Sequence, residues 1–599
     1  MITTTRFKKI VKGFIIATVY ISLASCSSRE EGSDLSQNAK GATLSVQGIA
    51  IEEPSEFIAQ KSASVNKNAG ITEGYENILA DNGIVSTKDF DVLTNISSQI
   101  TAYQKKATTA SVAKGNIAAV AAVTQSPVVA GIKYRILIYD ASNNALVANI
   151  DATAGTNPTI VVDAGKSYNW YAISTNDTNT PIVNTTSGVV ANNIVANKDF
   201  LYAGGNITTI QGQNNMNITF RHYTSQLIVD LDARGMFGKI NNTTAIELGT
   251  GTGSGFSSIV QSGDFNIFTG LYANLQNVAA ITAGNMVNKT GAGGTVGATK
   301  TATFYTVKTD VISANTLSLR LNTLSLTMDD ASTRNFSSNT VVPLNNNATV
   351  QPSLGYRTQI TARLIESGIK VSNILWARTN LYYAANVSNS DKYRFHPDNE
   401  YTIANLLNLT VGNLLSLQLN GASFDVNNEY WNWMATTPTG ATGTGDPCAL
   451  VYPQGLWRMP TSAEFTSLNG NNTIGVNTEN PLLLGGSRIS STFDPDAGQT
   501  VNTSYPANSR KLFIPFFGYR TGSTITDSPG SVSVLGLLVS GKAHYWSSTA
   551  NGANANYDTR NYDALIGPLL GAGTPTIASG VRGDGRNIRC VRVSNIPNT

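Results

Sequence analysis

Alternating apolar and polar residues predict a series of β-strands from residue 132 onward. An extended chain over residues 132–140 places Ile132, Tyr134, Ile136 and Ile138 on one face. Short strands separated by turn-forming Asn, Asp and Gly are typical of a β-sandwich rather than of a parallel α/β sheet. Further strands of this first block are expected at 42–49, 145–150, 159–162 and 168–173.

A second block of alternating residues begins at residue 216 and closes with an expected strand at 356–364. Its longest apolar series changes parity: Leu317, Leu319 and Leu321 share one face, whereas Leu324, Leu326 and Met328 fall on the other. A β-bulge or turn near residues 322–323 would return all six side chains to one core. The pattern therefore predicts a second sandwich that contains an irregular strand.

The pattern of apolar residues does not decide the secondary structure of one part of the first block. Residues 113–123 fit either a short helix or a buried strand. The stretches rich in Gly and Thr at 249–255 and 291–299 lack the GxGxxG spacing of a nucleotide-binding loop. We interpret these two stretches as loops.

The first 26 residues have the layout of an export signal. Basic residues between Arg6 and Lys12 precede a short apolar stretch at 13–23. The following Leu23-Ala24-Ser25-Cys26 resembles the lipobox of bacterial lipoproteins, which implies cleavage after Ser25 and acylation of Cys26. The predicted partner of Cys26 is then outer-membrane lipid; the alternative is a plain secretory peptide with a chance cysteine.

An acidic cluster at 30–34 follows the cysteine, and Ser27 stands where an Asp would favour inner-membrane retention. The cluster resembles the surface-export signal of Bacteroidetes-type lipoproteins. A solvated tether is the other interpretation, and both can be true. We therefore predict a signal peptide at 1–25, a tether at 26–41 and a location on the outer membrane at the cell surface.

The chain has 3 cysteines, and acylation of Cys26 leaves Cys448 and Cys590. In an oxidising compartment these two are expected to form a disulfide, although two separate buried thiols are the alternative. The formal net charge is +3 with 13% charged residues, and no basic stripe stands out. Nucleic acid is therefore not an expected partner.

Four motifs in the first two blocks carry a family resemblance: YRILIYD, GKSYNWYAIS, DFLYAGG at 199–205 and MNITFRHYTSQLIVDLDA. Together they resemble the fimbrillin family of Bacteroidetes surface lipoproteins over residues 42–366. The resemblance implies two tandem transthyretin-like β-sandwiches, at 42–214 and 215–368. It also implies other fimbrial subunits as partners, through exchange of a strand. Neither Arg29 nor Arg135 is a convincing maturation site, and no donor strand is assigned.

The region 369–599 differs in composition, with five of the six Trp residues and two of the cysteines. The motifs ILWARTNL, DPC, GLWRMPT, PFFGYR, HYWSST and IRCVR follow one another in an order that resembles the Fibrobacter succinogenes major paralogous domain. That family is related to C-type-lectin-like and formylglycine-generating-enzyme folds. The resemblance implies a compact α+β domain whose cysteines are bonded near its ends. The complete chain is thus expected to be mainly β, with two sandwiches followed by an α+β domain.

Local patterns within this region predict a helix and a core. Thr461 and Glu464 form the capping-box pattern, followed by apolar residues on one helical face. We interpret the Trp residues as core residues. Trp431 and Trp433 lie in a polar segment, so they are the candidates for exposed, sugar-stacking, ligand-binding residues.

No catalytic residue, cofactor or metal site is predicted from the sequence. His222, His396 and His544 lack the spacing of metal ligands. Residues 494–498 are partly similar to a calcium-binding loop, but a turn is the simpler interpretation. Arg582-Gly583-Asp584 spells an integrin-binding RGD, which in a Gly-rich stretch is also an ordinary turn. Formylglycine-type chemistry is disfavoured because both thiols stand where the family has a structural bond.

These observations favour a surface adhesin or a fimbrial accessory or tip subunit. Its C-terminal domain would bind a host or glycan surface ligand. The alternative is a glycan-capture lipoprotein of a polysaccharide uptake system, and a third hypothesis is an enzyme on the C-terminal domain. The ligand, and whether the chain polymerises, are not given by the sequence.

Overall fold

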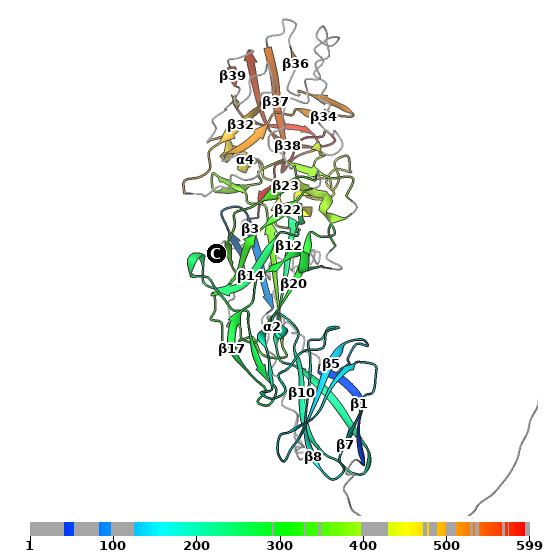
Figure 1. Ribbon diagram of the computed structural model, residues 1–599. Helices are drawn as coiled ribbons and strands as arrows, with labels where there is room; N and C mark the ends of the chain where they lie inside the picture. Colours follow the sequence, from blue (N-terminus) through cyan, green and yellow to red (C-terminus); the bar gives the residue numbers. More distant parts are fainter. Residues whose placement is uncertain are drawn as a thin grey trace, which may run out of the picture.

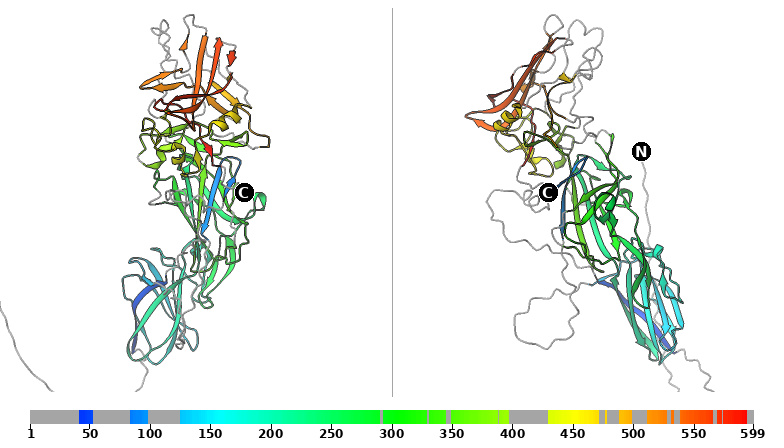
Figure 2. Two further views of the ribbon diagram at one scale, coloured as in Figure 1. Left: turned by 180° about the vertical axis from the view of Figure 1, so that it is seen from behind. Right: turned by 90° about the vertical axis from the view of Figure 1, so that its left-hand side faces the viewer.

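The computed structural model contains three β-rich parts that follow one another along an elongated molecule (Figure 1). Figure 2 shows the same order from behind and from the side. The prediction of a mainly β chain is confirmed. The residues that the structure describes are 41–52, 83–97, 125–289, 293–328, 331–344, 349–387, 389–396, 429–470, 476–477, 488–498, 511–527, 531–532, 538–565, 569–572 and 574–593.

The first sandwich is an eight-stranded sheet that surrounds one apolar core. Tyr134, Ile136 and Ile138 are completely buried in that core, which confirms the face predicted for this strand. The strand order is β4 (Gln125–Pro127), β1 (Ala42–Glu52), β11 (Gly212–His222), β10 (Leu201–Thr208), β8 (Ser167–Ser174), β5 (Lys133–Asp140) and β6 (Leu146–Thr153), with β7 (Thr159–Val162) also paired to β1.

The second sandwich encloses a larger core between a six-stranded and a five-stranded sheet, with a small third sheet at its side. The six-stranded sheet runs β19 (Val287–Asn288), β20 (Thr299–Thr306), β12 (Ser225–Gly235), β25 (Arg357–Ile365), β3 (Asp91–Ser97) and β2 (Ile84–Ser86). The five-stranded sheet contains β15 (Ser257–Ser258), β14 (Ala245–Thr250), β21 (Leu317–Thr323), β24 (Thr340–Pro343) and β18 (Ile281–Thr282). The small sheet contains β13 (Lys239–Ile240), β22 (Ser325–Thr327) and β23 (Thr333–Asn335), and 3-10 helices lie at Gly253–Gly255 and Ala283–Asn285.

The boundary expected between the sandwiches is wrong for residues 84–97, which were assigned to the first sandwich within 42–214. Strand β3 pairs antiparallel with β25 of the second sandwich, from Asp91 opposite Ile365 to Ser97 opposite Gln359. Val92 and Ile96 enter the core of the second sandwich, whereas Leu93 on the opposite face packs against the C-terminal domain. Both faces of the strand carry apolar side chains, and in this position both are covered.

The register irregularity predicted near residues 322–323 is present. The register between β14 and β21 shifts at Ala245 and Ile246, so that Asn322 has no partner across the ladder. Five of the six apolar side chains are buried in the same core, and Met328 packs against it. The bulge thus returns Leu324 and Leu326 to the core that holds the preceding leucines.

A small three-stranded sheet joins the two sandwiches: β17 (Leu271–Asn277), β16 (Gln261–Asn266) and β9 (Val189–Val190), beside helix α2 (Asn192–Val195). Phe265 and Ile267 of this sheet pack with Leu137 and Tyr139 on the outer face of β5. The Tyr202 hydroxyl donates to the Ile267 carbonyl at 2.7 Å. Strand β5 is therefore buried on both faces, and the joint is apolar.

The C-terminal domain brings its own beginning and end together. Trp376 of β27 pairs with Val591 of β41, within a four-stranded sheet of β26 (Ile369–Val371), β27 (Ile374–Trp376), β41 (Val591–Arg592) and β30 (Trp457–Arg458). A five-stranded sheet holds β36 (Ser531–Val532), β37 (Leu538–Asn551), β38 (Asn554–Leu565), β39 (Leu569–Ala572) and β40 (Thr576–Val581). Smaller sheets hold β28 (Leu381–Tyr383) with β29 (Tyr393–Phe395), β31 (Val476–Asn477) with β32 (Arg488–Phe493) and β33 (Leu512–Pro515), and β34 (Tyr519–Thr521) with β35 (Thr524–Thr526).

Helix α4 (Ser462–Asn469) confirms the predicted capping box. The Thr461 hydroxyl accepts from the Glu464 backbone N–H at 3.2 Å, and the Glu464 carboxylate accepts from the Thr461 N–H at 2.7 Å. Phe465 and Leu468 on its inner face are completely buried. Short 3-10 helices lie at Ser390–Lys392 and Pro447–Leu450. The lectin-like relationship of this domain stays a prediction.

Candidate functional site

The predicted disulfide between Cys448 and Cys590 is present, with the sulfur atoms 2.01 Å apart. Both cysteines are fully buried in a cluster that also contains Trp457 and Ile588. Cys448 lies in the 3-10 helix Pro447–Leu450, and Cys590 directly precedes β41. The bond ties the middle of the C-terminal domain to its last strand. Cys26, the predicted lipidation site, lies outside the described residues.

A buried carboxylate positions the disulfide segment. Asp446 accepts from the backbone N–H of Cys448 at 2.9 Å and from that of Met459 at 2.8 Å. Burial raises the pKa of Asp446 to about 6, against these hydrogen bonds, which favour the ionised form. The side chain therefore holds its proton more tightly in the folded chain than in the unfolded one.

We expect the Asp446→Asn variant to lose one component of the pH dependence of stability. Because the folded pKa is raised, this group makes the free energy of unfolding fall as pH rises from about 4 to about 6, by on the order of 1–3 kcal/mol. Urea denaturation across pH 4–7, with wild type and variant compared at each pH, measures the component. Parallel pH curves for the two proteins would contradict the assignment.

His544 changes the stability with pH in the direction opposite to Asp446. The wild type must therefore be compared with the Asp446→Asn variant at each pH. Burial, assisted by the nearby Arg586 charge, lowers the His544 pKa to about 4. This histidine therefore contributes stability that is complete above about pH 6.5 and is lost as pH falls towards 4. The two components overlap in wild type, so only the difference between wild type and Asp446→Asn isolates the carboxylate.

The prediction that Trp431 and Trp433 are exposed ligand-binding residues is wrong. Trp431 is completely buried and Trp433 is 7% exposed. The Trp431 backbone N–H donates to the Arg586 carbonyl at 2.9 Å, and the Trp433 indole N–H donates to the Ser547 carbonyl at 2.8 Å. Partners more than a hundred residues away enclose both rings, so neither offers a platform for a sugar.

The RGD sequence lies in a turn after β40, and its arginine is engaged within the domain. The Arg582 guanidinium lies 4.2 Å from the Trp433 ring and donates to the Gly552 carbonyl at 2.8 Å. The Asp584 carboxylate is 3.3 Å from the Arg586 guanidinium. An integrin ligand needs both charges free, so this arrangement favours the turn interpretation.

We expect Asp584→Glu to leave adhesion to integrin-bearing cells unchanged, since both charges already have partners within the domain. Cell adhesion to the immobilised protein measures the effect, with a soluble RGD peptide as competitor. The competitor should also be without effect. A twofold or larger drop in adhesion, with an unchanged melting temperature, would show that the tripeptide is recognised.

The remaining candidates for chemistry have structural partners. Asp496, in the calcium-loop pattern at 494–498, accepts from the backbone N–H groups of Ser372 and Asn373 at 2.8 Å each. The carboxylate thus holds a turn of the domain. His396 lies 3.5 Å from the Glu429 carboxylate. Among the described residues, no three His, Cys, Asp or Glu side chains are grouped to hold a metal ion. Within the same residues, no helix has the length and apolarity to cross a membrane.

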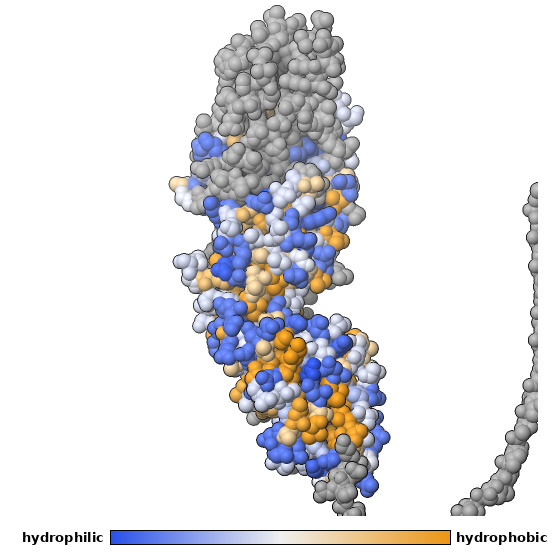
Figure 3. Space-filling view, in the orientation of Figure 1, coloured by the Kyte–Doolittle hydropathy of each residue, from blue (hydrophilic) through white to orange (hydrophobic). Residues whose placement is uncertain are grey.

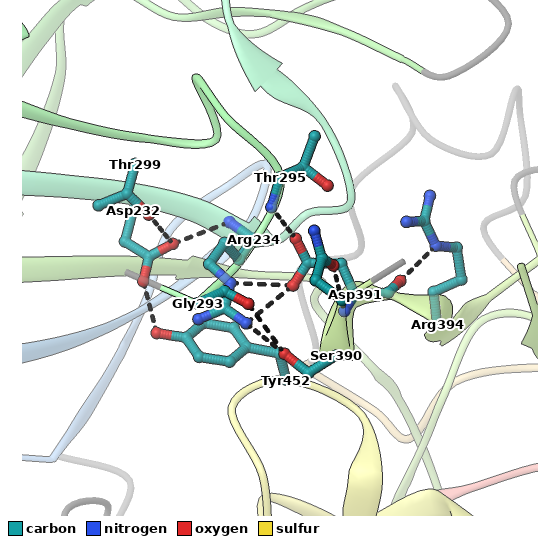
Figure 4. Close-up of polar contacts among 10 residues, drawn as sticks. Asp232, Arg234, Gly293, Thr295, Thr299, Ser390, Asp391, Arg394 and Tyr452 are labelled. Atoms are coloured by element: carbon teal, nitrogen blue, oxygen red, sulfur yellow. Dashed lines mark hydrogen bonds and ion pairs between the residues drawn. The ribbon is translucent and has the colours of Figure 1, made fainter. Parts of the chain in front are cut away.

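A polar network that the sequence did not reveal joins the second sandwich to the C-terminal domain (Figure 4). Arg234 on β12 forms an ion pair with Asp391 at 2.9 Å and donates to the Ser390 hydroxyl at 2.7 Å. Its guanidinium also stacks 3.9 Å from the ring of Tyr452. The Tyr452 hydroxyl donates to Asp232, and burial raises the pKa of that carboxyl. The second sandwich thus supplies the positive charge of Arg234, and the C-terminal domain supplies the negative charge of Asp391 that neutralises it.

A second set of buried contacts strengthens the same junction. Arg592 from the last strand pairs with Asp91 of β3 at 2.5 Å and donates to the Glu366 carbonyl at 2.9 Å. Both side chains of the ion pair are 5% exposed. Phe237 of the second sandwich packs edge-on against Phe395, with ring centroids 5.7 Å apart. The C-terminal domain therefore shares a core with the second sandwich.

Comparison with known proteins finds no matching family model and no matching curated protein. Solved structures that are similar to part of the chain include the three described next. A candidate cell adhesion protein from Bacteroides fragilis is 12% identical with a TM-score of 0.24, over 41% of this chain and 82% of that one. A candidate adhesin from Bacteroides thetaiotaomicron is 14% identical with a TM-score of 0.22, over 35% and 72%. The fimbrial anchor protein Mfa2 from Porphyromonas gingivalis is 13% identical with a TM-score of 0.20, over 40% and 91%.

Proposed function

We propose that this chain is a lipid-anchored protein of the cell surface. It would act as a fimbrial accessory or tip subunit, or as an adhesin, and present its C-terminal domain to a host or glycan ligand. The lipobox at Cys26 and the fimbrillin-like motifs support the anchor and the surface location. The placement of Ala42 and of the C-terminal domain at opposite ends of the molecule carries the proposal.

The direction of the first strand establishes this placement. Strands β1 and β11 are parallel, with Ala42 beside Gly212 and Ile51 beside Phe220. Since β11 leads directly into β12, Ala42 lies at the end of the first sandwich that is remote from the second. The C-terminal domain occupies the opposite end of the molecule (Figure 1). A tether that precedes Ala42 would hold one end, and the C-terminal domain would point away from it.

Other fimbrial subunits are the proposed partners of the first sandwich. Among the described strands, β6 pairs only with β5, and its Leu146 and Val147 are 43% and 41% exposed. Apolar side chains gather on the visible face of this sandwich (Figure 3). An open edge with exposed apolar residues suits the addition of a strand from another chain.

The anchor is tested by replacing Cys26 with alanine. We expect the variant to lose incorporation of labelled palmitate and to move from the membrane fraction to the soluble fraction, because the acyl chains are lost. Ser27→Ala is the matched control and should remain in the membrane. A Cys26→Ala protein that still labels and still sediments with membranes would contradict the anchor.

The surface role is tested on intact cells. Protease shaving should remove the C-terminal domain from whole cells, and isolated fimbriae should contain the chain. Binding assays should use the complete chain, since Leu93 and Phe237 contribute to the core of the C-terminal domain and a fragment starting at 369 lacks them. Protection from shaving together with absence from fimbriae would refute the proposal. That the chain is not an enzyme stays a prediction.

A further inference from the structure

Three connections and the first described residue form the end of the first sandwich that is remote from the second (Figure 1). Backbone hydrogen bonds of 3.0 Å and 2.8 Å join the connection at 140–145 to that at 163–167, and the latter to the connection at 208–213. In the last of these, the Gly212 N–H donates to the Gly41 carbonyl at 2.7 Å. We call these residues, together with the neighbouring Val161, the base of the first sandwich.

The base presents an exposed isoleucine on a fixed backbone. Ile210 is 69% exposed, although its own N–H donates to the Asn214 side chain at 2.9 Å. The Asn214 amide in turn donates to the carbonyls of Ile210 and Gly212 at 2.8 Å and 3.1 Å, and Asn214 itself is 8% exposed. Val161, which lies opposite Thr43 where β7 pairs with β1, is 59% exposed. The base therefore holds two large apolar side chains in water.

Charged groups at the base neutralise one another. Lys166 is the one cation among the described residues of the base, and its ammonium lies 2.9 Å from Asp163 and 3.7 Å from Asp140. The exposed polar side chains at 142–144 are uncharged Ser and Asn. Without a surplus of positive charge, attraction to anionic lipid would not hold the base on a membrane. Its uncharged polar groups suit the hydrated headgroup layer, and its two apolar side chains suit the layer beneath.

The position of the base limits what can lie against it. Residues 27–40 connect Cys26 to Gly41, so the two lie at most about 50 Å apart even when the chain is fully extended. A lipid on Cys26 would therefore keep the membrane within reach of the base. Binding to a surface to which the chain is already attached is intramolecular, so a few weak contacts are sufficient. Two separate side chains are too few for a stable protein interface, which buries about 800 Å² on each partner.

We propose that the base of the first sandwich rests on the lipid surface that holds the anchor, with Ile210 and Val161 inserted below the headgroups. The inference rests on the lipid anchor of the proposed function and adds a second, non-covalent contact with the membrane. This contact fixes the direction of the molecule, because the tether alone would allow the chain to lie along the surface. With the base docked, the C-terminal domain points away from the membrane.

The test places a fluorescent probe at the base of the full chain on phosphatidylcholine vesicles. The disulfide occupies Cys448 and Cys590, and acylation blocks Cys26. A cysteine introduced by Gln211→Cys therefore reacts alone with an environment-sensitive maleimide dye. Spin-labelled lipids quench a dye that lies among the headgroups, whereas aqueous iodide quenches a dye that lies in water.

The same dye at the other end of the sandwich is the matched control. Val129 is 72% exposed and follows β4, which pairs with the end of β1 that is remote from Ala42. We expect quenching by the lipid labels to be at least about threefold stronger at Gln211→Cys than at Val129→Cys. Iodide should quench the two positions in the reverse order.

A second arm separates this proposal from the lipid anchor itself. A chain with Cys26→Ala and a histidine tag directly before residue 26 is held on vesicles that contain nickel-chelating lipid. The base then has the same reach to the surface without acylation, and quenching at Gln211→Cys is again expected. An unacylated natural chain, together with quenching in the tagged chain, would exclude the anchor and would still show that the base binds lipid.

Substitutions identify the apolar contact. With the dye at Gln211→Cys, Ile210→Ser should weaken the quenching by lipid labels about threefold, because it removes the most exposed apolar side chain of the base. Val129→Ser removes a side chain of similar exposure at the other end and is the matched control, with no expected change. Melting temperatures verify that each variant is folded.

Three results would overturn the proposal. The first is equal quenching by the lipid labels at Gln211→Cys and Val129→Cys in both arms. The second is a dye at Gln211→Cys that neither the lipid labels nor iodide quenches, which would mean that a protein or a second copy of the chain covers the base. The third is quenching that appears only with phosphatidylglycerol in the vesicles, or that is unchanged in Ile210→Ser, because charge or other contacts would then hold the base.

Discussion

Replacing Cys448 and Cys590 together with alanine will lower the free energy of unfolding of the C-terminal domain by up to about 5 kcal/mol. The bond joins residues 142 positions apart, and a loop of this size gives the unfolded chain much conformational freedom once the bond is lost. Alanine is the appropriate replacement because both positions are fully buried. Urea denaturation followed by Trp fluorescence reports this domain, since Trp170 is the one Trp that lies outside it.

The Cys26→Ala variant is the control, because it removes a cysteine and keeps the buried bond. Limited proteolysis supplies a second measurement: the double variant should be cut first within the C-terminal domain, while the first sandwich remains resistant. A change of less than about 1 kcal/mol would mean that the packing around Trp457 and Ile588 is sufficient without the bond.

Breaking the Arg592–Asp91 ion pair will destabilise the junction between the second sandwich and the C-terminal domain by about 3–5 kcal/mol. In Arg592→Met the Asp91 carboxylate, which is 5% exposed, remains buried without its counter-charge. Arg592 also stacks 4.7 Å from the Trp457 ring, so the substitution removes an aromatic contact as well. Denaturation midpoints and protease sensitivity of the junction measure the loss.

An exposed ion pair provides the matched control. Arg221→Met removes the partner of Glu52 on the first sandwich, where the arginine is 54% exposed, and should cost less than about 1 kcal/mol. A double variant, Arg592→Met with Asp91→Leu, should recover part of the stability because it removes both buried charges. Equal effects of Arg592→Met and Arg221→Met would contradict the importance of the buried pair.

Local patterns predicted the elements better than their partners. Alternation identified the inward face of β5, and the capping box located α4, because both signals depend on neighbouring residues. Strand β3 was assigned to the wrong sandwich because alternation does not specify which sheet a strand joins. Its partner β25 lies more than 250 residues further along the chain.

The junction was missed for a related reason. On β12, Asp232 and Arg234 alternate with Leu231 and Ala233, a pattern typical of a strand with one face in solvent. The C-terminal domain covers that polar face with Asp391 and Tyr452, so the pattern is misleading. Conversely, polar neighbours made Trp433 look exposed, although Arg582 and Ser547 enclose it from distant parts of the sequence.

The pairing of β3 with β25 has a consequence for how the chain is threaded. From β1 in the first sandwich the backbone travels to β2 and β3 in the second, returns to β4, and finally crosses again from β11 to β12. Three covalent crossings therefore connect the two bodies, so the two sandwiches cannot be separated by cutting the chain at a single crossing. The same threading makes the second sandwich slow to complete: residues 91–97 are synthesised early and must wait for residues 359–365 before their ladder closes.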